Sequence, residues 1–251
     1  MPESKARALL LGLVREGVLP ASPDPPVGLE ELGQTAAAQG LSGLLLSAVE
    51  GGRAPWAEPL REGLTADRRR RLARALRQIQ LLTRAVALLS EAGIRTLPLK
   101  GAVLAETVYD IESDRPMSDV DLLALERWRD GLALLERSGY AVLSQGDHAW
   151  ALREAASGEL LELHRSVTSA PGLFPCDVGA LWARRLPGRA QLAFRPSPED
   201  LLLQLALHAA FQHGLVLSLV QWLDFRRVLE REAVDVERLR ARAVESRALV
   251  P

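Results

Sequence analysis

Cysteine and lysine are scarce in this sequence. Cys176 is the only cysteine among the 251 residues, so the chain cannot form an intrachain disulfide. Because disulfides are rare in the reducing cytoplasm, we expect a cytoplasmic protein. Lys5 and Lys100 are the only lysines, and every other strongly basic residue is an arginine. The composition therefore does not account for a lysine at position 100.

The sequence also has no large charge excess and no long apolar run. Its formal net charge is −1, which gives no general affinity for nucleic acid. The apolar stretch at residues 9–14 is too short for a membrane span or a signal peptide, and Arg15 and Glu16 interrupt it. With 48% hydrophobic and 25% charged residues, the chain can bury a sizeable core. We therefore expect a globular protein without membrane or nucleic-acid partners.

A run of four arginines, Arg68–Arg71, could contact RNA or DNA. It lies within a helical pattern at residues 59–92, however, and a charge run on a helix more often forms a solvated face. We expect the solvated face.

Hydrophobic periodicity divides the chain into a helical, a mixed and a second helical region. Apolar spacings of three and four predict helices at residues 6–15, 29–38, 41–49 and 59–92, with a connector at 20–26. In the middle of the chain, alternation and turn residues predict strands at 94–99, 117–123, 140–143, 148–153 and 160–165, helices at 102–109 and 126–138, and turns at 145–147 and 157–158. Beyond an irregular segment at 171–198, a helical pattern with Ser197 as its N-cap covers 198–232. We therefore expect three regions, residues 1–92, 93–170 and 171–251.

Asp119 and Asp121 are separated by one residue inside an apolar run, Met117–Leu123. Alternate residues of a strand point to the same face, so both carboxylates would project together. At a separation of roughly 6–7 Å, two like charges oppose each other's ionisation unless cations lie between them. Mg²⁺ is typically held by one or two carboxylates together with substrate phosphates. The pair therefore indicates a divalent-cation site, and the alternative is a solvent-exposed strand end.

Lys100 and Gly101 lie between the predicted strand at 94–99 and the predicted helix at 102–109. Glycine lets the backbone approach a ligand closely, and a helix N-terminus favours anions, so this order is typical of a phosphate site. Lys100 would add a mobile cation there. In the alternative, Gly101 only closes a tight turn and Lys100 is solvated.

Glu162 lies in a segment, residues 159–165, that alternates like a half-buried strand. Next to the strand of Asp119 and Asp121, it would complete a three-carboxylate, two-metal site for phosphoryl transfer. The alternative is an exposed residue of the sheet face. His164 shares the face of Glu162 and could orient a carboxylate.

The order of these segments resembles the nucleotidyltransferase superfamily, which includes DNA polymerase beta and the aminoglycoside nucleotidyltransferases. The likeness is greatest to a bacterial family of uncharacterised nucleotidyltransferases and covers roughly residues 94–229. Besides the strand-Lys-Gly-helix, Arg-Pro-Met-Ser-Asp-Val-Asp and Glu-Leu-His segments, it includes Pro196–Leu202, His208, His213 and Trp222–Asp224. It implies an α/β fold of the α+β type, in which a nucleotidyltransferase core with a mixed sheet is flanked by N-terminal and C-terminal helical segments.

The resemblance also assigns roles to individual residues. Asp119 and Asp121 match the metal-binding pair, Glu162 matches the third carboxylate, and Lys100 and Gly101 match the phosphate-side turn. The superfamily usually has Gly-Ser or Gly-Gly at this turn, whereas this chain has Gly101 followed by alanine and a longer insert before Asp119.

The missing hydroxyl leaves Lys100, Arg115 and backbone amides to hold the triphosphate. A guanidinium can grip phosphate oxygens with two hydrogen bonds, although Arg115 could instead pair with Asp114 or Glu112 at the surface. Ser118 could bond phosphate or simply shape the entry to the strand.

Two of the four histidines, His208 and His213, are about 140° apart on a helix and therefore poorly placed to share a zinc ion. They could pack within the helical segment or form a wall of the cleft.

The activity implied is transfer of NMP from an NTP such as ATP to an acceptor hydroxyl, with Mg²⁺ or Mn²⁺ as cofactor and pyrophosphate released. The acceptor could be a small molecule or a protein, and the sequence specifies neither it nor the oligomeric state. The alternative is an inactive nucleotide- or partner-binding module of the same fold.

Overall fold

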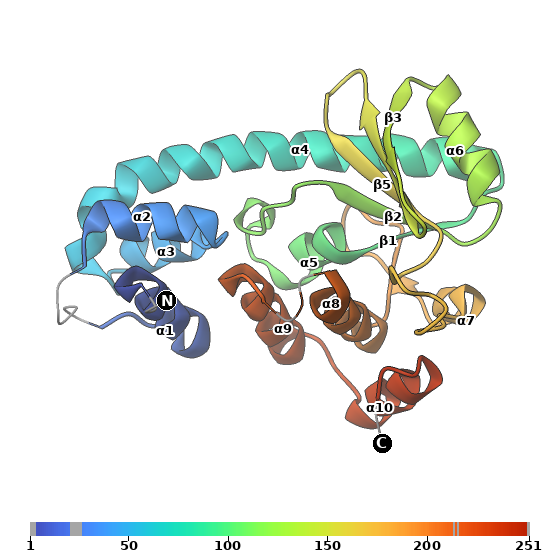
Figure 1. The fold of residues 1–251 in the computed structure, drawn as a ribbon. Coiled ribbons are helices and arrows are strands. Elements are labelled where there is room, and N and C mark those ends of the chain that lie inside the picture. The colour runs from blue at the N-terminus through green and yellow to red at the C-terminus, as the bar shows by residue number, and fades with distance from the viewer. Residues whose placement is uncertain (1–3, 21–26, 213, 215, 250–251) are drawn as a thin grey trace.

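A five-stranded mixed sheet lies at the centre of the molecule, with helices packed around it (Figure 1). The computed structural model describes residues 4–20, 27–212, 214 and 216–249. The strands of the sheet are β1 (Thr96–Pro98), β2 (Val120–Ala124), β3 (Tyr140–Gln145), β4 (Ala149–Glu154) and β5 (Leu160–His164). The mixed α/β architecture with helical segments before and after the sheet is the one that the sequence predicts.

The helices account for most of the rest of the described chain. The α-helices are α1 (Lys5–Glu16), α2 (Leu29–Ala38), α3 (Ser42–Glu50), α4 (Arg61–Glu91), α5 (Lys100–Val108), α6 (Trp128–Arg137), α7 (Val178–Ala183), α8 (Pro198–Gln212), α9 (Leu219–Arg231) and α10 (Val236–Glu245). Two 3₁₀ segments, η1 (Pro55–Leu60) and η2 (Glu112–Asp114), and a small hairpin of β6 (Leu186–Pro187) and β7 (Phe194–Arg195) join them. None of the helices in the described ranges combines the length and apolar character needed to cross a membrane.

The order of strands in the sheet is β1-β2-β5-β4-β3. β2 and β5 pair in parallel, while the other pairings in this sheet are antiparallel. Because β3, β4 and β5 form consecutive hairpins, the chain returns across the sheet and places β5 directly beside β2. The strand of Glu162 therefore lies next to the strand of Asp121, as expected.

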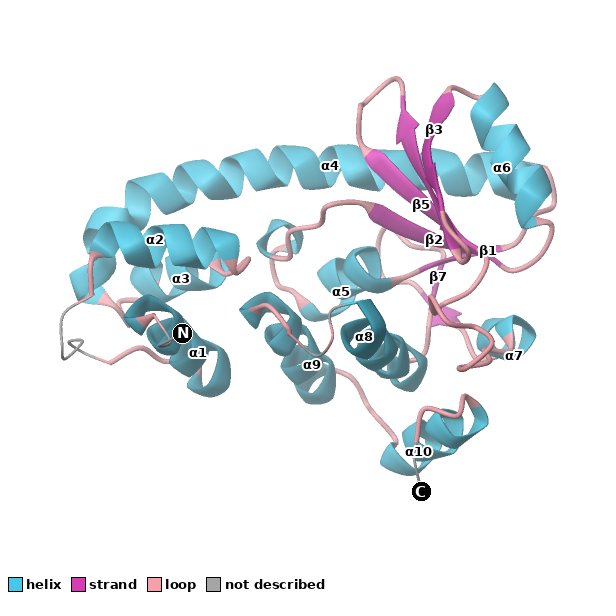
Figure 2. Cartoon of the chain, viewed as in Figure 1, coloured by secondary structure: helices cyan, strands magenta, loops and turns pink. Residues whose placement is uncertain are grey.

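Helices cover both sides of the sheet (Figures 1 and 2). The 31-residue helix α4 runs along one side and contacts β1, β2 and β5. Helix α5 contacts β2 on this same side, where residues of α4, α5 and Val120 line one pocket, and α8 and α9 pack against α5. On the other side Leu181 of α7 clusters with Leu97 and Leu123. Buried apolar residues from Ala6 to Val228 form one hydrophobic cluster, so the N-terminal and C-terminal helices share a core with the sheet.

The predicted N-terminal helices are confirmed, with small shifts at their ends. The pattern at 29–38 coincides with α2, and the long pattern at 59–92 corresponds to α4 preceded by η1. Proline at both positions 55 and 59 favours the tighter 3₁₀ segment before α4, because proline lacks the N–H that an α-helix uses. Most of the predicted connector at 20–26, residues 21–26, lies outside the described residues.

Two predictions for the C-terminal part are wrong. Residues 171–198 are not irregular throughout, because α7 and the β6–β7 hairpin lie there; these elements are too short to give a periodic pattern. The continuous helical pattern at 198–232 is in fact two helices, and α9 begins at a capping box of Ser218 and Gln221. The N-cap prediction is confirmed, since Ser197 Oγ accepts a hydrogen bond from Asp200 N at 3.3 Å. Helix α10 extends the helical region beyond the predicted range.

The arginine run on α4 is not a uniformly solvated face, so that expectation needs correction. Arg68 is only 18% exposed and forms ion pairs with Glu50 of α3 and Asp114 of η2. Arg70, by contrast, is 71% exposed. Part of the run therefore fastens α4 to neighbouring elements, because acidic side chains of those elements face it.

Candidate functional site

The acidic residues expected to form the site come together at the junction of β2 and β5. Asp121 and Glu162 are paired residues of these parallel strands, so their side chains project from the same face of the sheet. Asp119 lies immediately before β2, which begins at Val120, so the strand starts later than predicted. Asp121 is buried, whereas Asp119 and Glu162 are half-buried.

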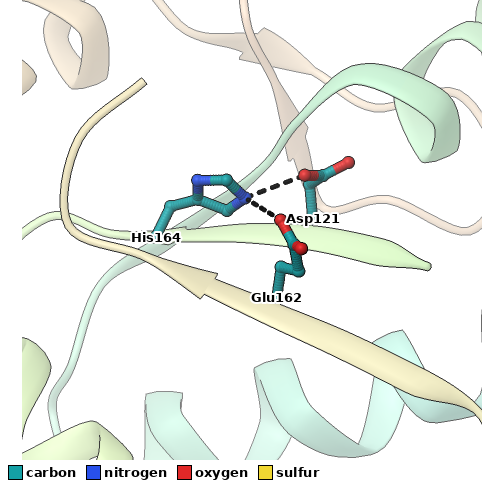
Figure 3. Close-up of side chains that lie close together, drawn as sticks. All are labelled: Asp121, Glu162 and His164. Carbon is teal, nitrogen blue, oxygen red and sulfur yellow. Dashed lines mark hydrogen bonds and ion pairs between the residues drawn. The ribbon is translucent and has the colours of Figure 1, made fainter. Parts of the chain in front are cut away.

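Two basic side chains contact Asp121 from within the protein. Lys100 Nζ donates to Asp121 Oδ1 at 2.7 Å. His164 Nε2 lies 2.8 Å from the same oxygen and 3.3 Å from Glu162 Oε2. Figure 3 shows the imidazole pointing at both carboxylates. The prediction that His164 shares the face of Glu162 and orients a carboxylate therefore agrees with the contacts.

The three carboxyl groups differ in pKa because their neighbours differ. Burial raises the pKa of Asp119, and the charges of Asp121 and Glu162 raise it further. Burial acts in the same direction on Asp121, but the hydrogen bond with His164 and the charge of Lys100 outweigh it and hold the pKa of Asp121 well below its usual value. The hydrogen bond with His164 also lowers the pKa of Glu162, against the effect of burial. Asp119 is therefore the carboxylate whose charge is compensated least.

All seven residues that the sequence assigns to the site line one open cleft of about 540 Å³. They are Lys100, Gly101, Arg115, Ser118, Asp119, Asp121 and Glu162. His208 of α8 and Ser218 and Gln221 at the start of α9 line the same cleft. This volume lies within the range usual for small-molecule pockets.

The phosphate-side turn is packed directly against the loop that carries Asp119. Helix α5 begins at Lys100, two residues earlier than predicted, and Lys100 has a left-handed backbone with φ of 42°. Such a conformation is uncommon for a residue with a side chain, so the surrounding contacts must hold it. A Cβ added to Gly101 would lie 2.8 Å from Met117 Cγ. A side chain at position 101 would therefore require the Met117 side chain to move, which gives Gly101 a packing role beside the predicted one.

Arg115 is held by Asp224 of α9. Arg115 Nε lies 2.9 Å from each carboxylate oxygen of Asp224, which also accepts a hydrogen bond from the Tyr109 hydroxyl at 2.7 Å. The surface pairing of Arg115 with Asp114 or Glu112, offered as an alternative, does not form, and Asp114 pairs with Arg68 instead. A buried carboxylate thus fixes the guanidinium at the wall of the cleft.

The donor atoms at the junction of the two strands fit a divalent cation. Asp121, Glu162 and His164 each offer one ligand atom, and these atoms lie within 4.8 Å of one another. Carboxylate oxygens suit Mg²⁺ and Mn²⁺, and an imidazole nitrogen suits transition ions as well. Asp119 is outside this group of three but lines the same cleft, where it offers a further carboxylate.

No role for Asp224 follows from the sequence, and for His208 the sequence leaves two alternatives. Asp224 stands out only as part of the Trp-Leu-Asp segment, and its function as the anchor of Arg115 depends on a contact across 109 positions of the chain. For His208, the alternative of a cleft wall agrees with the structure. His213 lies outside the described residues.

Comparison with known families identifies the chain. A family model described as uncharacterised nucleotidyltransferase matches residues 25–251. The protein belongs to this family. The match is longer than the segment of resemblance at residues 94–229, and it includes the N-terminal helices from α2 onward. The protein is therefore a nucleotidyltransferase by family, while no curated protein sequence matches it.

Several solved structures are similar to this chain. The antibiotic-resistance factor ANT(2'')-Ia, studied in solution, is similar with a TM-score of 0.52 and 15% identity, over 69% of this chain and 92% of that chain. A crystal structure of ANT(2'')-Ia in complex with adenylyl-2''-tobramycin gives a TM-score of 0.48 and 16% identity, over 68% and 97% of the two chains. A nucleotidyltransferase-like protein from Paracoccidioides brasiliensis gives 0.42 and 17%, over 68% and 88%. At 15% identity, the first of these establishes a nucleotidyltransferase fold and nothing about substrates.

Proposed function

We propose that the protein transfers a nucleoside monophosphate from an NTP to an acceptor hydroxyl, with release of pyrophosphate, and that the reaction requires Mg²⁺ or Mn²⁺. The observation that carries this proposal is the pairing of Asp121 with Glu162 across β2 and β5, with Asp119 in the same cleft. The turn at Lys100 and Gly101 opens into that cleft as well. Clustered carboxylates beside a helix N-terminus are what cation-assisted phosphoryl transfer needs.

We assign cation binding and proton acceptance to the carboxylates according to the exposure of their side chains. Asp119, Asp121 and Glu162 would hold the cation. A bound divalent cation supplies positive charge that stabilises the phosphoryl oxygens in the transition state. The side chain of Glu162 is 31% exposed against 7% for Asp121, so Glu162 is the paired carboxylate better placed to accept the proton of the acceptor hydroxyl. The remaining acceleration would come from positioning, without a covalent protein intermediate.

The phosphate tail would lie along the turn that precedes and begins α5. Backbone amides at Gly101, the Ser118 hydroxyl and the Arg115 guanidinium are the donors that line this part of the cleft. Lys100 adds positive charge to the same turn while its Nζ contacts Asp121. Because Asp224 already fixes Arg115, the guanidinium would bind the nucleotide with little further loss of side-chain conformational entropy.

A labelling experiment tests the proposal and identifies the acceptor class. The full chain is incubated with each α-³²P-labelled NTP, Mg²⁺ or Mn²⁺, and a lysate separated into macromolecules and metabolites. We expect cation-dependent transfer of label to one fraction, with stoichiometric pyrophosphate, and loss of transfer with Glu162→Gln. A small-molecule acceptor would be analogous to the tobramycin that carries the adenylyl group in the ANT(2'')-Ia complex, and a labelled protein would indicate a macromolecular acceptor.

The control variant is Glu58→Gln, which removes an exposed surface carboxylate that does not line the cleft. It should transfer label like the unmodified protein. Tight NTP binding without pyrophosphate release in any fraction would contradict the enzyme and favour a nucleotide-binding module.

A further inference from the structure

The two oxygens of the Asp121 carboxylate have different surroundings. Oδ1 receives Lys100 Nζ at 2.7 Å and His164 Nε2 at 2.8 Å. A carboxylate oxygen has about two lone-pair positions, so these donors occupy both. Oδ2 has no hydrogen-bond partner among the described residues, and Asp121 lines the cleft. Asp121 therefore has one oxygen committed to the protein and one left for a ligand.

Lys100 and His164 are built into the protein on the side of Oδ1. Their side chains are 12% and 2% exposed, and that of Asp121 is 7% exposed. His164 shares the sheet face of Asp121 and Glu162 but is not among the residues that line the cleft, so the imidazole reaches both carboxylates from a buried position. Displacing either contact would leave a buried polar group without its partner, which is costly.

We propose that the cleft binds a single divalent cation through Asp121 Oδ2, Asp119 and Glu162, and that Lys100 takes the place of a second one. A carboxylate that bridges two ions with one oxygen on each needs Oδ1 for the second ion, and here the Lys100 ammonium already neutralises Oδ1. His164 is a positioning residue that fixes Asp121 and Glu162 relative to each other. This inference rests on the proposed function and replaces the two-metal site expected from the sequence.

Counting bound Mn²⁺ tests the inference without any turnover assay. The full chain is titrated with Mn²⁺ alone, and free Mn²⁺ is measured by electron paramagnetic resonance. We expect one equivalent bound to the unmodified protein. Lys100→Met, which keeps the apolar stem but removes the charge, should bind a second equivalent because Oδ1 loses its built-in cation. Lys100→Arg keeps a cation and should stay at one equivalent.

The chain provides a matched control in Lys5, the only other lysine, which is exposed on α1. Lys5→Met should bind one equivalent, and far-UV circular dichroism checks that each variant is folded. Two equivalents on the unmodified protein would overturn the inference but leave the proposed function intact. A count of one for Lys100→Met would overturn the role given to Lys100.

Pulsed electron paramagnetic resonance of the Mn²⁺ complex gives an independent readout. Because His164 is assigned to the carboxylates, we expect no coupling from a directly bound imidazole nitrogen. Such a coupling, lost in His164→Gln, would make His164 a ligand and overturn its positioning role. Absence of any bound Mn²⁺, together with cation-independent transfer of label, would overturn both this inference and the metal requirement of the proposed function.

Discussion

Buried carboxylates occur on two sides of the same sheet, and their partners differ. On the α4 side, Glu159 accepts hydrogen bonds from Arg74 and Arg77 at 3.1 and 3.0 Å. Glu154 accepts two from Arg84, at 2.8 and 2.6 Å, and further bonds from Tyr140 and Ser157. On the cleft side, Asp121 contacts Lys100 and His164, Glu162 contacts His164, and Asp119 lines the same cleft. The side chains of Glu159, Glu154 and Asp121 are equally buried, at 7%, 6% and 7% exposure.

The comparison separates structural from functional carboxylates better than burial does. Three arginines balance two glutamates on the α4 side, so those groups have no need of a ligand. On the cleft side negative charge is in excess, as the raised pKa of Asp119, caused by burial and by its acidic neighbours, indicates. A bound cation would remove that excess, and this is the physical reason for placing the metal in the cleft.

Substitutions of a cleft-side and an α4-side carboxylate should differ most in their effect on turnover. Glu162→Gln keeps the shape of the side chain but removes the charge that would hold a cation or accept a proton. We expect kcat to fall about 10²–10⁴-fold while nucleotide affinity changes little, measured as pyrophosphate release with the acceptor fraction found by labelling. Glu159→Gln, three residues earlier, should retain kcat within about twofold. Equal losses of kcat in Glu162→Gln and Glu159→Gln would contradict the distinction between functional and structural carboxylates.

Removing Asp121 should have the largest effect on stability. Asp121→Asn leaves Lys100 and His164 facing a neutral amide in a buried position, and breaking a buried pair in this way costs about 3 kcal/mol. The sign follows from the lowered pKa of Asp121, because the ionised group stabilises the fold at pH above the usual value of 3.8 and this stability is lost as the pH falls through the lowered value. Urea denaturation at neutral pH measures the effect. An unchanged unfolding midpoint would show that the contacts with Lys100 and His164 contribute nothing.

Removing a carboxylate on the α4 side should destabilise the protein less than Asp121→Asn does, because the arginines on that side can be solvated by water. Arg74 and Arg77 are 45% and 48% exposed, so Glu159→Gln should lower the free energy of unfolding by only about 1–2 kcal/mol. Mn²⁺ binding should be unchanged. The exposed pair of Glu58 and Arg61 provides the control, since Glu58→Gln should change stability by less than about 0.5 kcal/mol. Weaker Mn²⁺ binding in Glu159→Gln would mean that the two sides are coupled.

The smallest effect, and one of opposite sign, is expected for Asp119. Because the folded protein raises its pKa, ionisation of Asp119 opposes folding at pH above the usual value of 3.8. Asp119→Asn should therefore stabilise the protein by roughly 0.5 kcal/mol at neutral pH, the size usual for exposed like charges. The gain should vanish below pH 3.8, where both forms are neutral, and Mn²⁺ binding should weaken. A stability loss at neutral pH would mean that Asp119 is already compensated.

The sequence could predict the site because its residues lie at strand and helix boundaries with clear periodicity. Alternation placed Glu162 and His164 on one face, and the turns at 145–147 and 157–158 brought their strand beside β2. The short elements after residue 171 could not be predicted in this way, since a six-residue helix such as α7 shows too little of the helical period.

By itself the sequence determined the order of the main helices and strands, the family, and the carboxylates that share a cleft, because these follow from local periodicity and from motifs of a few residues. Only the tertiary structure decided how the charges pair. Lys100 meets Asp121 across 21 positions of the chain, and Arg115 meets Asp224 across 109. The pairing of each basic side chain with a carboxylate depends on the packing of α5, α9 and α4 around the sheet. The distances between these side chains cannot be predicted from the local sequence. For that reason the sequence predicts acidic residues for two metal ions, whereas the contacts of Asp121 in the folded protein led us to propose one.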